Sequence, residues 1–85
     1  MATYKILYWQ EIPSQVKAED VQEEVNLELA PRFMERIDQL AHQRGLQGAD
    51  DYLAQWRWSE EAERDGSAQE VAEAVKAELE AKAKW

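Results

Sequence analysis

The chain has 85 residues, a formal net charge of −8 and no cysteine. This length allows one small domain with a modest core, and the lack of thiols excludes disulfides and cysteine-ligated metal sites. The acidic residues are spread along the chain and disfavour binding to nucleic acid phosphates or anionic membranes. No apolar run reaches the roughly 18 residues of a membrane span and no signal peptide is recognisable, so we expect a cytoplasmic protein without membrane insertion.

The first third of the chain predicts β-strands. Residues 3–10 are apolar on both faces, which is typical of a strand that is central in a sheet. Pro13 interrupts this run, and residues 15–18 can form a short second strand. Between residues 21 and 29 the apolar residues Val21, Val25, Leu27 and Leu29 alternate with Gln22, Glu24, Asn26 and Glu28. This period of two predicts a third strand, with Leu27 toward the core and Glu28 toward solvent.

The remaining chain predicts three helices. Pro31 opens the first, at residues 31–44, and Gly45 suits its C-cap. The apolar side chains of this helix form one stripe: Phe33, Ile37, Leu40 and Ala41. The second begins near Asp50 and Asp51, carries Tyr52, Leu53 and Trp56 on one face, and is expected to continue through residues 59–64.

The third helix begins at a capping box formed by Ser67 and Glu70. Its apolar stripe is thin and consists of Val71, Ala74, Val75 and Leu79. The elements together predict an α+β fold, in which a small antiparallel β-hairpin or meander is covered by two helices and followed by a C-terminal amphipathic helix. We expect residues 1–65 to form a single domain and residues 66–85 to form the C-terminal helix, which is either docked or bound to a partner.

The sequence offers little for catalysis. His42 follows Asp38 by four positions, so the two side chains can form a surface pair or an oriented general base. No nucleophile signature, phosphate-binding loop or metal motif accompanies them. We therefore expect no enzyme activity, no cofactor and no metal. An enzyme component that contributes Asp38 and His42 is an alternative.

The segment Trp56-Arg57-Trp58 indicates a contact surface. Residues two positions apart on a helix differ by about 200°, so the two indoles cannot both face one core. We expect Trp56 to be buried and Trp58 to be exposed. Trp and Arg are enriched at interface hot spots. The predicted partner-binding residues are Arg57, Trp58, Val71, Val75 and Leu79.

Residues 25–31, followed by a helix with Phe33, Ile37 and Leu40, by Gly45 and by a second helix, resemble a ribbon-helix-helix DNA-binding domain. In that family, outward strand side chains read bases and the start of the second helix binds phosphate. The matching positions here are mostly acidic: Glu24, Asn26, Glu28, Asp50 and Asp51. We therefore expect no nucleic-acid binding, and a DNA-binding regulator is an alternative.

A closer resemblance covers nearly the whole chain. It is carried by Tyr8-Trp9, residues 12–16, residues 31–33, Ile37-Asp38, Gly45-Leu46, residues 51–56 and the tail at residues 71–79. These motifs are similar to a small bacterial domain family named virulence factor. The resemblance implies an accessory role, since some relatives look joined to larger proteins, and it implies no catalytic residues. We expect a non-enzymatic protein–protein interaction module or small accessory subunit with a protein partner, and a homo-oligomer stays open.

Overall fold

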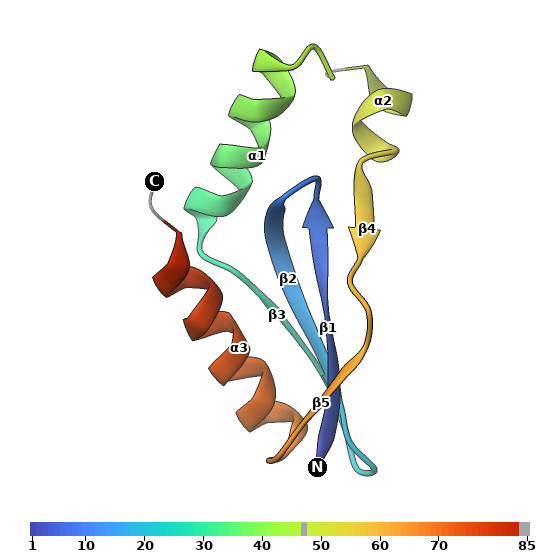
Figure 1. Ribbon diagram of the computed structural model, residues 1–85, viewed down its shortest axis with the longest axis vertical. Coiled ribbons are helices and arrows are strands. Elements are labelled where there is room, and N and C mark those ends of the chain that lie inside the picture. The colour runs from blue at the N-terminus through green and yellow to red at the C-terminus, as the bar shows by residue number, and fades with distance from the viewer. Residues whose placement is uncertain (47, 84–85) are drawn as a thin grey trace.

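The computed structural model describes residues 1–46 and 48–83. The predicted α+β class is confirmed (Figure 1). The elements in chain order are β1 (Ala2–Trp9), β2 (Ile12–Glu19), β3 (Glu24–Glu28), α1 (Pro31–Gln43), α2 (Ala49–Leu53), β4 (Trp56–Trp58), β5 (Ala62–Arg64) and α3 (Ala68–Lys82). The last two residues of the predicted C-terminal segment, 84 and 85, lie outside the described part.

The five strands form one antiparallel sheet with β1 at its centre. On one side of β1 the order is β2 and then β3. On the other side, β4 pairs with residues 7–9 of β1 and β5 pairs with residues 2–4. The two short strands therefore act as one interrupted edge strand, and the prediction that residues 3–10 form a central strand is confirmed.

The interruption between β4 and β5 is a bulge of one residue. Leu7 lies opposite Trp58, whereas Tyr4 lies opposite Ala62, so three residues of the edge oppose two residues of β1. Ser59 maintains the hydrogen bonding at this point: the Ile6 N–H donates to Ser59 Oγ, and the Ser59 N–H donates to the Ile6 carbonyl, both at 2.8 Å. A side-chain hydroxyl thus takes the place of a ladder carbonyl.

The prediction of a long second helix is wrong. Helix α2 ends at Leu53, and residues 56–58 and 62–64 are strands. The unpaired edge of β1 explains the difference, because its N–H and C=O groups gain partners only if this segment is extended. Tryptophan also favours strands. Leu53, predicted to lie on the buried face of the helix, is 63% exposed.

Two strand boundaries also differ from the prediction. Strand β2 begins at Ile12, because a bulge between the Leu7 and Tyr8 pairings accommodates Pro13 within it. Strand β3 begins only at Glu24, since Asp20 Oδ1 accepts hydrogen bonds from the N–H groups of Gln22 and Glu23 and so forms a turn. Local side-chain acceptors of this kind compete with the strand ladder.

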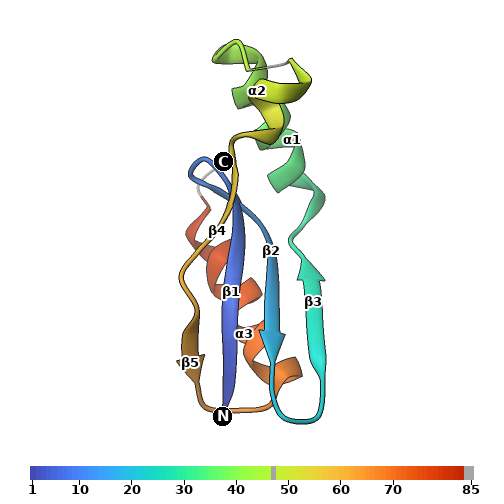
Figure 2. The same ribbon diagram turned by 90° about the vertical axis from the view of Figure 1, so that its right-hand side faces the viewer.

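Helix α3 lies across one face of the sheet (Figure 2). Its predicted capping box is present, with Ser67 and Glu70 accepting hydrogen bonds from each other's N–H groups. Val71 and Val75, 1% and 4% exposed, face the strands. Asp20 Oδ2 accepts a hydrogen bond from the Ala68 N–H at 2.8 Å, so the β2–β3 turn stabilises the first turn of the helix.

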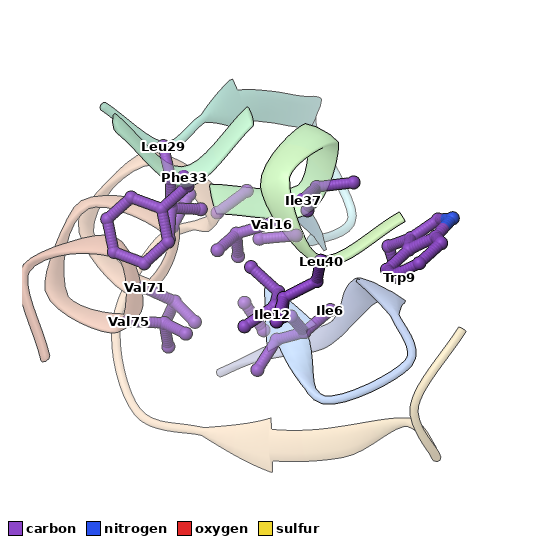
Figure 3. Close-up of a cluster of buried hydrophobic side chains, with 14 of the residues drawn as sticks. Ile6, Trp9, Ile12, Val16, Leu29, Phe33, Ile37, Leu40, Val71 and Val75 are labelled. Atoms are coloured by element: carbon purple, nitrogen blue, oxygen red, sulfur yellow. The ribbon is translucent and has the colours of Figure 1, made fainter. Parts of the chain in front are cut away.

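Helix α1 lies beyond α3 on the same side of the sheet (Figure 1). All four residues of its predicted apolar stripe are buried, and Gly45 adopts the expected positive φ of 69°. The N-cap residue Ala30 has no side-chain acceptor, and its N–H instead donates to Glu80 Oε2 of α3 at 2.8 Å. The core between these elements is continuous (Figure 3): Ile6, Ile12, Val16, Leu29, Phe33, Ile37, Leu40, Val71 and Val75.

Replacing Asp20 with Ala should lower the melting temperature at neutral pH. Hydrogen bonds from the N–H groups of Ala68, then Gln22 and Glu23, hold the pKa of Asp20 below its usual 3.8. The carboxylate therefore stabilises the fold above pH 3.8, and this contribution is lost as the pH falls through the lower folded-state pKa. Thermal melts over a pH series should show the gap from wild type closing in acid. The control Glu73→Ala, at an exposed site on α3, should show no such gap. A gap that is constant across the acid range would contradict this role.

Replacing Val75 with Ala should destabilise the protein by about 1.5–3 kcal/mol, because two methyl groups leave the core and a cavity remains. Urea unfolding measures this loss. The neighbouring exposed change Ala77→Ser should stay within about 1 kcal/mol of wild type. If Val75→Ala unfolds at the same urea concentration as wild type, the stripe of α3 is not core.

Candidate functional site

One face of the sheet is left uncovered by the described helices. Ile6 lies opposite Val16, and both side chains are buried beneath α3. Because side chains alternate along a strand, their neighbours point to the other side. Figure 2 looks onto that side, where only α2 stands near one end. We call this surface the open face; its side chains are Lys5, Leu7, Gln15, Lys17, Asn26, Glu28 and Trp58.

Trp58 is the largest exposed side chain of the open face. It lies opposite Leu7 and is 43% exposed. Lys5 Nζ stands 5.0 Å from the centre of its ring, a cation–π contact that leaves the rest of the indole free. The predicted exposure of Trp58 is therefore confirmed. The helical reasoning behind it does not apply, because the residue belongs to a strand.

In strand β4, Trp56 and Trp58 point to the same side and Arg57 points to the other. The Arg57 guanidinium lies 5.3 Å from the centre of the Tyr8 ring and donates a hydrogen bond to the Gln10 carbonyl at 3.3 Å. Trp56 is only partly buried. Two indoles thus flank the open face, where the sequence predicted one.

A hollow of about 620 Å³ adjoins the open face where the chain leaves β3 and enters α1. We call it the α1 hollow. Its apolar lining comes from three separate segments: Leu7, Leu29, Pro31, Phe33, Met34 and Trp56. Its polar lining consists of Ser14, Gln15, Glu28, Glu35 and Asp38. Met34 is 41% exposed, so the hollow is open to solvent at the helix.

An aromatic cluster forms one end of this region. Tyr52 lies between two indoles, with ring centres 5.6 Å from Trp9 and 6.1 Å from Trp56. The Trp9 indole N–H donates to the Tyr52 carbonyl at 3.0 Å, which attaches α2 to β1. Burial raises the pKa of the Tyr52 hydroxyl, and the negative charge of Asp38 raises it further. The cluster gives Trp56 a defined position beside the hollow.

The five residues predicted as partner-binding do not form one surface. Val71 and Val75 are buried in the core, and Leu79 is partly buried against it. Arg57 points away from the open face, on which Trp58 lies. Of the two alternatives left open for the C-terminal helix, docked or bound to a partner, the structure has the docked one.

Comparison with known proteins identifies the family. A family profile described as Virulence factor matches residues 7–84. The chain belongs to the virulence factor family. Searches of curated proteins and of solved structures found no match. The predicted resemblance is therefore confirmed, and the match includes every segment that lines the α1 hollow.

In this virulence factor family member, Asp38 and His42 are both exposed on α1. Asp38 lines the α1 hollow, whereas His42 does not. No group of three His, Cys, Asp or Glu among the described residues is arranged to hold a metal ion. None of the described helices is long and apolar enough to cross a membrane.

Tryptophan substitutions test the placement of the open face. Trp9 is fully buried, so Trp9→Ala should cost about 3–5 kcal/mol. Trp58→Ala, at an exposed position, should cost about 1 kcal/mol or less. Urea unfolding followed by circular dichroism compares the two. Similar losses from both substitutions would show that Trp58 belongs to the core.

Proposed function

We propose that this virulence factor family member is a non-enzymatic protein–protein interaction module, a small accessory subunit that binds its partner through the open face and the adjoining hollow. The observation that carries the proposal is the exposure of Trp58 beside Leu7 and Trp56 on the face opposite α3. An indole in this position adds little to the core, whereas buried indoles dominate the energy of many interfaces. We also propose a cytoplasmic location, and a homo-oligomer stays open.

The alternative of a ribbon-helix-helix regulator finds less support. The strand that would read bases is β3, and its outward side chains are Glu24, Asn26 and Glu28. Two glutamates there oppose phosphate, as do Asp50 and Asp51 in the first turn of α2. Strand β3 also pairs with β2 of its own chain, so that edge is not free to form a two-chain ribbon. We therefore propose no nucleic-acid partner.

The enzyme alternative rests on Asp38 and His42. Asp38 lines the hollow, whereas His42 does not. We propose that Asp38 serves binding. A protein partner is thus the function that the open face supports best.

Substitution of Trp58 tests the proposal. Immobilised wild-type protein, Trp58→Ala and the control Leu53→Ala are each exposed to lysate of the native bacterium, and retained proteins are identified by mass spectrometry. Leu53 is the matched control because it is a large exposed apolar residue on α2, outside the hollow. Loss of a buried interface indole costs about 2 kcal/mol, or about thirtyfold in affinity. We expect a partner held by wild type and Leu53→Ala and lost from Trp58→Ala, with unchanged melting curves. Undiminished capture by Trp58→Ala would refute the open face as the binding surface.

A further inference from the structure

We propose that the α1 hollow receives a positively charged amphipathic segment of a partner protein, whose apolar side chains enter the hollow while its Lys or Arg side chains meet Glu28, Glu35 and Asp38. This inference rests on the proposed function and specifies the chemistry of the partner. It follows from three features of the hollow as the described residues show it: an apolar lining, an acidic rim without ion pairs, and nearby cations whose contacts lie elsewhere.

The lining favours apolar side chains. Leu7 and Trp56 contribute from the strands, Leu29 and Phe33 from the start of α1, and Met34 from its exposed side. The volume of about 620 Å³ lies within the range of about 300–1,000 Å³ that binding pockets occupy. Methionine adapts its shape to different apolar partners, which suits a site for side chains of a flexible segment. Burying such side chains supplies the non-directional part of the binding energy.

The rim is acidic and unpaired. Glu35 and Asp38 are three positions apart on α1 and so share one side of the helix, and Glu28 ends strand β3. Within residues 1–46 and 48–83, none of these three carboxylates makes a hydrogen bond or ion pair. Other acids do have partners: Glu11 pairs with Arg44, Glu24 with Lys17, and Glu78 with Arg64. The rim therefore presents negative charge that its surroundings leave uncompensated.

The nearest cations of α1 are directed elsewhere. Arg32 Nη2 donates to the Glu80 carbonyl at 2.9 Å, on the side of α3. Arg36 follows Arg32 by one turn, and its Nη1 is 3.5 Å from Gln39 Oε1. Arg32 lies three positions before Glu35 and so neighbours it on the helix, but among the described residues no ion pair joins the two side chains. On the open face, Lys5 contacts Trp58 and Lys17 pairs with Glu24. None of these four cations forms an ion pair with the rim among the described residues, so a cation of the partner can compensate it.

A second copy of this chain suits the hollow poorly. Two molecules that each carry a formal charge of −8 repel one another, and the carboxylates of the rim concentrate part of this charge at the point of contact. A basic segment is instead attracted to the acidic rim as it approaches, and the pairing of its cations with the carboxylates favours one alignment in the hollow. The apolar lining then favours a segment whose apolar and basic side chains lie on opposite sides, as in an amphipathic helix bound to a groove.

The direct test uses a synthetic helical peptide of Leu and Lys with an amphipathic pattern, and a matched peptide with Glu in place of Lys. Affinities are measured by isothermal titration calorimetry. We expect the Lys peptide to bind, more weakly at high salt, and the Glu peptide not to bind. The NMR signals of Leu7, Met34 and Trp56 should shift on binding. No binding of the Lys peptide, or shifts confined to other surfaces, would overturn the proposal.

Charge reversal separates a specific site from general attraction to an acidic protein. The test variant is Glu35→Lys with Asp38→Lys, and the control is Asp65→Lys with Glu73→Lys at exposed sites away from the hollow. Each replacement adds two charges, so both variants go from −8 to −4. We expect the test variant to lose about tenfold or more in affinity while the control loses much less. Equal losses would mean non-specific attraction, and dimerisation of wild type through the hollow would mean that a second copy is the occupant.

The same variants distinguish this inference from the proposed function. In the capture experiment, a partner lost from Trp58→Ala but kept by Glu35→Lys with Asp38→Lys would leave the open face as a binding surface and refute the basic segment. A partner kept by both would refute both. Melting curves of all variants ensure that a loss of binding is not a loss of folding.

Discussion

The docking of α3 on the sheet is the interaction on which the rest of the structure depends. Val71 and Val75 seal one face of the strands, and a carboxylate stabilises the contacts near each end of the helix. At its start, Asp20 accepts from the Ala68 N–H; near its end, Glu80 accepts from the Ala30 N–H. Because Ala30 is the N-cap residue of α1, the last helix of the chain also contacts the start of the first one. The two helices are thereby held as one layer.

This layer decides which face of the sheet stays open to the proposed partner. A small antiparallel sheet can bury one face and leave the other toward solvent. Here α3 covers one side (Figure 2), so Trp58 and Leu7 lie on the side that remains, and the α1 hollow lies between that side and α1. The aromatic contacts of Tyr52 with Trp9 and Trp56 then fix the hollow's strand wall relative to α2. A rigid frame of this kind lowers the entropy that binding must overcome.

Sequence patterns predicted the elements whose signals are local. Pro31, the apolar stripe of α1 and Gly45 lie within one segment, and so do Ser67 and Glu70 at the start of α3. Strands β4 and β5 could not be predicted in this way, because Tyr52, Leu53 and Trp56 fit a helical spacing. What makes residues 56–64 extended is the unpaired edge of β1, some fifty positions earlier.

The candidate site shows the same limit. The exposure of Trp58 was predictable from two indoles close together, but its neighbours were not. Leu7, Glu28, Met34 and Trp56 come from separate segments, and only the sheet register and the turn into α1 bring them together. A signal was present in α1, where Met34, Glu35 and Asp38 share a side that is neither the apolar stripe nor the arginine stripe. That this side of α1 lines a hollow becomes clear only when the strand residues Leu7, Glu28 and Trp56 are placed beside it.

The edges of the sheet explain how a chain rich in strands can stay free of self-assembly. At one edge, the bulge at Ser59 breaks the row of unpaired backbone groups into two short pieces. At the other, β3 begins and ends with glutamate. If a second β3 aligned antiparallel and in register, Glu24 of each copy would stand opposite Glu28 of the other, and like charges in that position are destabilising. These glutamates thus disfavour edge-to-edge pairing of two copies.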